Sequence, residues 1–170
     1  MGEFLSFDEV YRRHAPDVYR FCLFQLRDRE AAKDVAADTF VSALASYNRV
    51  APSEDTVLFW LIRIAKCDVI DHRRRAQRWA NVMTTLRNQR HHPTGEVEAL
   101  AGVNENLRRV LEAMGSLSKR DRLLIGLRCA ADLPFEEIGK LTGMSTKTAT
   151  TATRRAIQRL RSQPEVVLDG

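Results

Sequence analysis

The chain has 170 residues, 44% hydrophobic and 29% charged, which excludes a disordered polymer and allows one ordinary domain or two small ones. Its 27 Lys and Arg residues exceed its 22 Asp and Glu residues, and the resulting net charge of +5 suits a polyanionic partner such as nucleic acid. No run approaches the roughly 18 apolar residues of a membrane span and no secretory signal is visible, so we expect a cytoplasmic protein without membrane insertion.

Helical periodicity covers nearly the whole chain and strand patterns are nearly absent, which predicts an all-α fold. The first predicted helix begins after Ser6, which forms a capping box with Glu9, and Pro16 is expected to kink or split this helix. The second helix begins near Asp28 and carries one buried stripe. The predicted stripe consists of Ala32, Val35, Ala36, Thr39, Phe40, Ala43, Leu44 and Tyr47.

The third predicted helix begins near Thr56. Residues 57–65 are apolar nearly all round, which predicts burial on most sides, and residues 73–78 are strongly basic. The polar segment 87–95 offers nothing for a core to bury and is the best linker in the chain. An extension of the third helix would carry Trp79, Val82, Met83 and Leu86.

The second half of the chain predicts a cluster of short helices, of which two begin at Ser118 and Pro134 and the last is capped by Ser145. We therefore expect two small helical domains joined by a flexible linker, the C-terminal one containing a helix-turn-helix. The expected parts are the first domain at 5–80, the linker at 81–104, the second domain at 105–163 and a tail at 164–170.

Residues 134–145 form a short helix that a glycine turn joins to a capped helix, the layout of a helix-turn-helix. Gly139 is small where the two helices would cross, and Gly143 can take the left-handed conformation of the turn. The last helix would then enter the major groove of DNA, although a plain helical hairpin with a solvated basic face is an alternative. The residues expected to contact DNA here are Ser145, Thr146, Lys147, Thr148, Thr150, Thr151, Arg154 and Arg155.

A second basic segment, His72–Arg78, adjoins Trp79, and no acidic residue occurs between His72 and Gly95. Arginines can bind backbone phosphate, and an exposed aromatic ring can stack on an unpaired base. The alternative is a solvated charge run at the end of a helix, where cations also interact favourably with the helix dipole.

The face of the second helix away from its stripe combines two acidic residues, Asp34 and Asp38, with the small apolar residues Ala37 and Val41. In an otherwise basic chain this face suggests contact with a basic protein surface, and an ordinary exposed face is the alternative. A metal or acid–base site is disfavoured because no histidine lies near these carboxylates in sequence.

Signals for catalysis are missing from the sequence. Cys22, Cys67 and Cys129 are odd in number and far apart, which indicates reduced thiols, and the histidines lack metal-ligand spacing. There is no Gly-rich phosphate loop and no G-x-S-x-G sequence. We expect a protein that is not an enzyme and that uses no cofactor, metal or small-molecule substrate.

The order of these segments resembles the extracytoplasmic-function class of the sigma-70 family, from about residue 7 to residue 161. Residues 33–41 are similar to the family's acidic helix, which docks on core RNA polymerase. Residues 60–74 are similar to its −10-reading helix and residues 117–161 to its −35-reading domain. The −10 contacts that the resemblance implies are Arg63, Lys66, Cys67, His72, Arg73, Arg74, Arg75 and Arg78.

The resemblance implies an alternative RNA polymerase sigma factor that binds core polymerase and directs promoter recognition and transcription initiation. It also implies promoter DNA as a partner and an anti-sigma factor as an inhibitor. Two alternatives stay open: a sigma-like adaptor that sequesters an anti-sigma factor, and a plain helix-turn-helix transcription regulator.

This chain departs from the family's pattern at a few positions. The family often has Gln at Ala37 and Asn at Cys67, and its recognition helix usually carries Val, Lys and Arg at Ala149, Thr150 and Ala152. Missing cations weaken non-specific DNA binding. We therefore expect either an unusual promoter or DNA binding that depends on polymerase or another partner.

Overall fold

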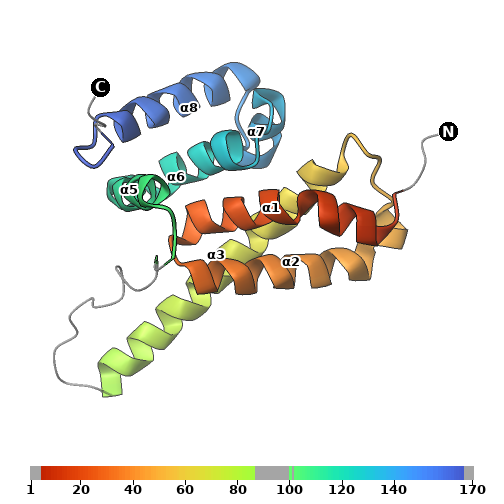
Figure 1. Cartoon of the computed structure of the whole chain (residues 1–170), viewed down its shortest axis with the longest axis horizontal. Coiled ribbons are helices and arrows are strands. Elements are labelled where there is room, and N and C mark those ends of the chain that lie inside the picture. Colours follow the sequence, from red (N-terminus) through yellow and green to blue (C-terminus); the bar gives the residue numbers. More distant parts are fainter. Residues whose placement is uncertain (1–4, 87–99, 101, 167–170) are drawn as a thin grey trace.

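The computed structural model of the protein describes residues 5–86, 100 and 102–166, and no strand occurs among them. The all-α fold expected from the sequence is confirmed (Figure 1). The elements are α1 (Phe7–Leu26), α2 (Arg29–Val50), α3 (Val57–Leu86), α5 (Glu105–Ala113), the 3-10 turn η1 (Met114–Ser116), α6 (Lys119–Ile125), the π-helical turn η2 (Gly126–Ala130), α7 (Phe135–Thr142) and α8 (Thr146–Arg161).

Polar side chains cap the first two helices where the sequence predicts. The Glu9 amide donates to Ser6 Oγ, and the Ser6 amide donates to Glu9 Oε2 at 2.8 Å, which completes the capping box. Asp28 Oδ1 accepts the amides of Glu30 and Ala31 at the start of α2. Caps of this kind satisfy backbone donors that have no partner within the helix.

Pro16 lies inside α1, which continues without a break from Phe7 to Leu26, so the expected split does not occur. A proline inside a helix removes one backbone hydrogen bond and costs about 3 kcal/mol. Val10 and Val18 are fully buried on either side of it, and burying such a side chain stabilises a fold by about 1.5–3 kcal/mol. Packing on both sides of the proline therefore holds the helix together.

Helices α1, α2 and α3 pack against one another as the N-terminal domain. The predicted stripe of α2 is buried with one exception, because the side chain of Leu44 is 59% exposed. At 100° per residue, Leu44 lies at the edge of the stripe and next to the face that carries Ala37 and Val41. Leu44 therefore belongs to the exposed face of α2 and not to the core.

Helix α3 extends beyond the hydrophobic core of the N-terminal domain. One side of its first half is buried as far as Val69, whereas its last turns project beyond α1 and α2 (Figure 1). The extension is helical through Leu86, so α3 covers the first residues of the predicted linker 81–104. Residues 87–99 and 101 of that linker lie outside the described part of the chain.

Two glycines shape the helix-turn-helix as the sequence predicts. Gly143 caps α7 with a φ of +71°, a backbone conformation that costs other residues roughly 1–2 kcal/mol. A Cβ atom on Gly139 would lie 2.7 Å from the backbone oxygen of Met144, so only glycine lets α7 and the following turn approach this closely. The side chain of Ser145 then caps α8 by accepting the amide of Thr148 at 3.2 Å.

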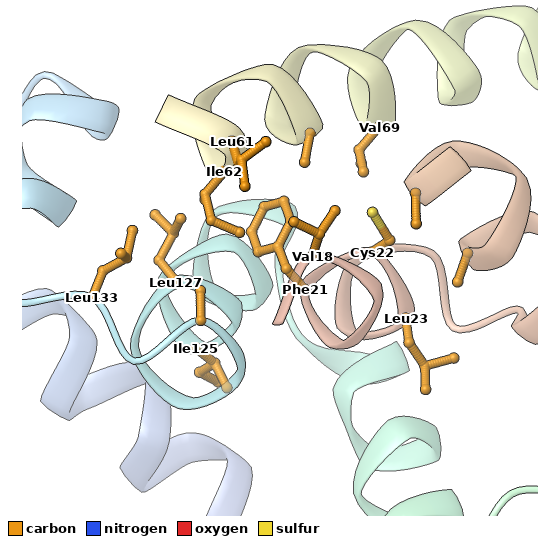
Figure 2. Close-up of a cluster of buried hydrophobic side chains, with 14 of the residues drawn as sticks. Val18, Phe21, Cys22, Leu23, Leu61, Ile62, Val69, Ile125, Leu127 and Leu133 are labelled. Carbon is orange, nitrogen blue, oxygen red and sulfur yellow. The ribbon is translucent and has the colours of Figure 1, made fainter. Parts of the chain in front are cut away.

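The two domains pack against each other and share one hydrophobic core (Figure 2). Phe21 of α1, Ile62 of α3 and Leu127 of η2 lie in this core, and all three side chains are fully buried. We call this packing of α1 and α3 on α6, η2 and α7 the closed arrangement.

Hydrogen bonds also cross the boundary of the closed arrangement. Gln25 Nε2 donates to the backbone oxygen of Arg122 at 3.0 Å, and Lys66 Nζ donates to that of Leu141 at 2.6 Å. The Lys66 ammonium thereby satisfies a carbonyl in the last turn of α7, where cations are favoured.

Candidate functional site

Helix α8 presents the polar residues expected for DNA contact. Thr146, Lys147, Thr148, Thr151, Arg154 and Arg155 are exposed, and Ala149, Thr153, Ala156 and Leu160 pack inward. Thr150 is half-buried, and its hydroxyl donates to the backbone oxygen of Thr146 at 2.8 Å. Because Ala149 is fully buried, its departure from the family's pattern is a matter of packing within the domain.

A hollow of about 560 Å³ separates the exposed side of α8 from the start of α6. Arg120 and Arg159 line it together with the expected residues Lys147 and Arg155. Sequence reasoning missed both arginines, because Arg120 comes from another helix and Arg159 lies one turn beyond the expected set. Arg159 Nη1 lies 2.9 Å from Asp121 Oδ2, whereas no ion pair of Arg120, Lys147 or Arg155 occurs within the described chain. The hollow therefore offers cations to a phosphate backbone.

The residues expected on α3 divide between two faces. Arg63, Cys67, Arg74 and Arg78 follow one another at steps of four, seven and four, which aligns them on one side of a helix, and all four are exposed. Arg75 is also exposed, and His72 is half-buried. This open side of α3 has the cations needed for a single DNA strand, and Trp79 is 68% exposed at its end.

Lys66 and Arg73 lie on the side of α3 that faces the C-terminal domain, and both are half-buried. Lys66 donates to the backbone oxygen of Leu141, and an Arg73 guanidinium nitrogen donates to that of Gln25. These two of the eight expected −10 residues are therefore occupied by contacts within the protein, that of Lys66 across the domain boundary and that of Arg73 within the N-terminal domain.

The acidic face of α2 is fully accessible. Asp34, Ala37, Asp38 and Val41 are all exposed, and Val41 is 70% exposed. Their spacing of three, one and three places them on one side of the helix, where the exposed Leu44 adds a further apolar contact that the sequence pattern assigned to the core. An exposed apolar strip bordered by carboxylates is typical of a surface that binds a protein with basic residues around its contact.

The histidine, cysteine and acidic side chains of the described residues do not gather into a metal-ligating cluster, because no group of three or more of them is placed to hold a metal ion. His14 is buried on α1 and its ring nitrogens make no hydrogen bond there, and burial lowers the pKa of this side chain. Its Nδ1 lies 3.6 Å from Asp17 Oδ2, and its burial places the ring at the core of the N-terminal domain. No helix in the described ranges has the length and apolarity to cross a membrane.

Comparison with known proteins identifies the family. The Sigma-70 region 2 family matches residues 10–79, and the Sigma-70, region 4 family matches residues 113–162. RNA polymerase sigma factor CarQ of Myxococcus xanthus is 29% identical over 160 residues, which cover 92% of this chain and 87% of that protein. ECF RNA polymerase sigma factor SigM of Bacillus subtilis (strain 168) is 26% identical over 164 residues, with 93% and 94% covered.

The chain belongs to the extracytoplasmic-function class of the sigma-70 family. It is an alternative sigma factor, whose partners are core RNA polymerase and promoter DNA. A solved structure of the sigma factor RpoE, in complex with the anti-sigma factor NepR from Bartonella quintana, shares its fold with a TM-score of 0.72 and 20% identity. The likeness covers 95% of this sigma factor and 98% of that chain.

The two family matches fall on the two domains of this sigma factor. Region 2 covers α1, α2 and most of α3, so the acidic face and the open basic face of α3 belong to one domain. Region 4 covers α6, α7 and α8, and with them the hollow beside the helix-turn-helix. The acidic face therefore shares a domain with one basic surface, and the second basic surface lies in the other domain.

Proposed function

We propose that this sigma factor docks on core RNA polymerase through the exposed face formed by Asp34, Ala37, Asp38, Val41 and Leu44. The observation that carries this assignment is the charge contrast between the faces. The face of α2 is acidic and apolar, whereas the exposed sides of α3 and α8 are basic. A polymerase surface with basic residues would complement the first, and DNA would complement the other two.

Promoter recognition divides between the two basic surfaces in this proposal. The open side of α3, with Arg63, Cys67, Arg74 and Arg78, holds the separated −10 strand through phosphate contacts and stacking. The N-terminal part of α8 enters the major groove at −35, with Thr148, Thr151 and Arg155 toward base edges and phosphates. Arg120 and Arg159 extend the −35 phosphate contacts beyond α8.

The closed arrangement has to open before this protein reads a promoter. Lys66 joins the DNA contacts only after it leaves the backbone oxygen of Leu141 in the other domain, whereas the bond of Arg73 to Gln25 lies within the N-terminal domain and has to break separately. An anti-sigma factor would keep the sigma factor from polymerase by stabilising the closed arrangement and covering the face of α2. The likeness to a sigma factor that was solved with an anti-sigma factor supports this regulation. We also propose that this protein has no catalytic activity and that it acts in the cytoplasm.

Run-off transcription on fragmented genomic DNA tests the proposal, with core RNA polymerase in the presence and absence of this protein. We expect discrete new start sites that disappear with the double variant Asp34→Ala, Asp38→Ala. The control is Glu54→Ala, Asp55→Ala, which removes the same charge from exposed positions of the same domain. Start sites that persist with the first variant, or vanish equally with the control, would refute the role of the α2 face.

A further inference from the structure

A second basic hollow lies at the boundary of the two domains in the closed arrangement. It has a volume of about 640 Å³, within the range of 300–1,000 Å³ that is usual for small-molecule sites. It is formed by the end of α1, the start of α2, the basic part of α3 and the start of α6. Its lining residues include Arg27, His72, Arg73 and Arg74 from one domain and Lys119 and Arg122 from the other.

The charge of this boundary hollow is strongly unbalanced. Five of its described lining residues are Lys or Arg, and the one carboxylate among them is that of Asp28. Asp28 Oδ1 already accepts the backbone amides of Glu30 and Ala31, so this carboxylate is directed toward the start of α2. Arg74 Nη1 lies 3.7 Å from Asp71 Oδ1, an exposed carboxylate outside the lining, so the lining itself keeps an excess of cations.

The excess of positive charge acts most strongly on the side chains of Arg73 and Arg122. Burial lowers the pKa of both guanidinium groups, and a second arginine lowers it further: Arg122 acts on Arg73, and Arg27 acts on Arg122. Arginine keeps its charge in proteins, so the result is repulsion across the domain boundary. In addition, Arg122 Nε is buried and has no hydrogen-bond partner among the described residues. A buried donor without a partner costs about 1–3 kcal/mol.

We propose that the boundary hollow binds a small polyphosphate anion that bridges the two domains and stabilises the closed arrangement. Phosphate oxygens accept hydrogen bonds from guanidinium groups in a two-pronged geometry, and they would satisfy Arg122 Nε while cancelling the repulsion. The ligand can be an inorganic polyphosphate or the polyphosphate of a nucleotide. Leu26, Ala31, Ala76 and Ala80 also line the hollow and give a nucleoside an apolar wall.

Duplex DNA does not fit this site. The hollow exists only where α6 faces α3, and its lining comes from both domains. Bound anion and bound promoter are therefore alternatives, because His72, Arg73 and Arg74 are also expected to contact the −10 strand. Anion binding would make this sigma factor less available for promoter DNA, and it does so without an anti-sigma factor.

Calorimetric titration of the full chain with inorganic tripolyphosphate at fixed ionic strength tests the proposal. We expect one binding site per chain. The affinity should fall at least tenfold in each of three single variants: Arg122→Gln and Lys119→Gln on α6, and Arg74→Gln on α3. The matched control is Arg155→Gln, which removes a cation from the hollow beside α8 and is expected to leave this affinity unchanged. Circular dichroism verifies that each variant folds.

Either of two results would overturn the proposal. If Arg155→Gln weakens binding as much as Arg122→Gln does, the anion binds beside α8 or follows net charge alone. If the α6 variants weaken binding and Arg74→Gln does not, the anion does not bridge the domains. A parallel titration with ATP distinguishes the two sources of polyphosphate, since tighter binding than tripolyphosphate indicates the nucleotide. Run-off transcription with Arg122→Gln stays at the wild-type level in the absence of anion, so failure here is distinguishable from failure of the sigma-factor function.

Discussion

The hydroxyl of Thr39 on α2 lies 2.9 Å from Asp68 Oδ2 on α3, and this contact joins the helix with the acidic face to the helix with the basic face. Thr39 is completely buried. Its hydroxyl also lies 2.9 Å from the backbone oxygen of Val35. The hydroxyl therefore shares its one proton between the Asp68 carboxylate and the backbone oxygen of Val35.

This geometry predicts a pH-dependent stability. Burial raises the pKa of Asp68 above its ordinary 3.8, against the lowering effect of the Thr39 hydrogen bond. The folded state therefore binds this proton more tightly than the unfolded state. The contribution is fully present below pH 3.8 and is lost as the pH rises through the folded pKa.

Asp68→Asn removes the partly buried charge that forms when Asp68 ionises, so its stability relative to wild type should increase as the pH rises through that window. Urea unfolding at about pH 4 and about pH 7.5 measures the difference. A relative stability of Asp68→Asn that falls with rising pH would contradict the assignment.

Phe21→Ala is expected to destabilise the protein by about 3–5 kcal/mol, because it empties a fully buried site that both domains share. Phe24→Ala removes a ring that is only partly buried at the margin of the core and should cost less. Chemical unfolding measures the loss of stability in each of the two variants. Equal losses would indicate that Phe21 does not connect the domains.

Gly126→Ala should weaken the closed arrangement. A Cβ atom at this position would collide with Gln25 Nε2 and displace the side chain that donates to the backbone oxygen of Arg122. Loss of a buried hydrogen bond costs about 1–3 kcal/mol, which exceeds the roughly 1 kcal/mol that alanine gains in a helix. Small-angle X-ray scattering should show a larger radius of gyration for the variant. An unchanged radius together with increased stability would show that Gln25 relaxes without cost.

The two turn glycines should respond differently to alanine. Gly143→Ala has free space for its Cβ atom and is expected to cost only about 1–2 kcal/mol for its left-handed backbone. Gly139→Ala places a Cβ atom against the backbone oxygen of Met144, so α7 must move relative to the start of α8. We expect the greater loss of −35 DNA binding for Gly139→Ala in a transcription assay. The reverse order would show that the turn, and not the close approach, sets the geometry.

Arg155→Gln tests the −35 surface. Removing a cation that binds phosphate should weaken binding about equally for all DNA sequences and lower the salt slope of binding by about 1. Binding of holoenzyme to a promoter fragment at several salt concentrations measures both. Arg109→Gln on α5 is the control, since this exposed arginine pairs with Glu105 at a distance from α8. A loss confined to particular base pairs would assign Arg155 to base reading.

Local sequence chemistry was sufficient for the helices and their ends. The caps at Ser6, Asp28 and Ser145 and the turn at Gly143 follow from neighbouring residues, and they occur as expected. Periodicity also identified the buried side of α2, except at Leu44 on its edge. It could not show that burial keeps α1 continuous across Pro16, because that depends on partners distant in sequence.

The relation between the domains was beyond reach of the sequence for the same reason. A buried stripe shows that one side of a helix packs against other elements, but it does not indicate which elements these are. Lys66 and Leu141 are 75 residues apart, and neither carries a local signal of their contact. The boundary hollow likewise depends on Arg122, which sequence reasoning placed in no site.

The shared core of the two domains has a consequence for the level of transcription that this sigma factor supports. A partner that recognises only separated domains encounters the open fraction of molecules, and its apparent affinity falls in proportion to that fraction. Every 1.4 kcal/mol of boundary stability changes this fraction about tenfold. Side chains such as Phe21 and Leu127, which touch neither polymerase nor DNA in this scheme, therefore set the basal output and the threshold at which a signal produces a response.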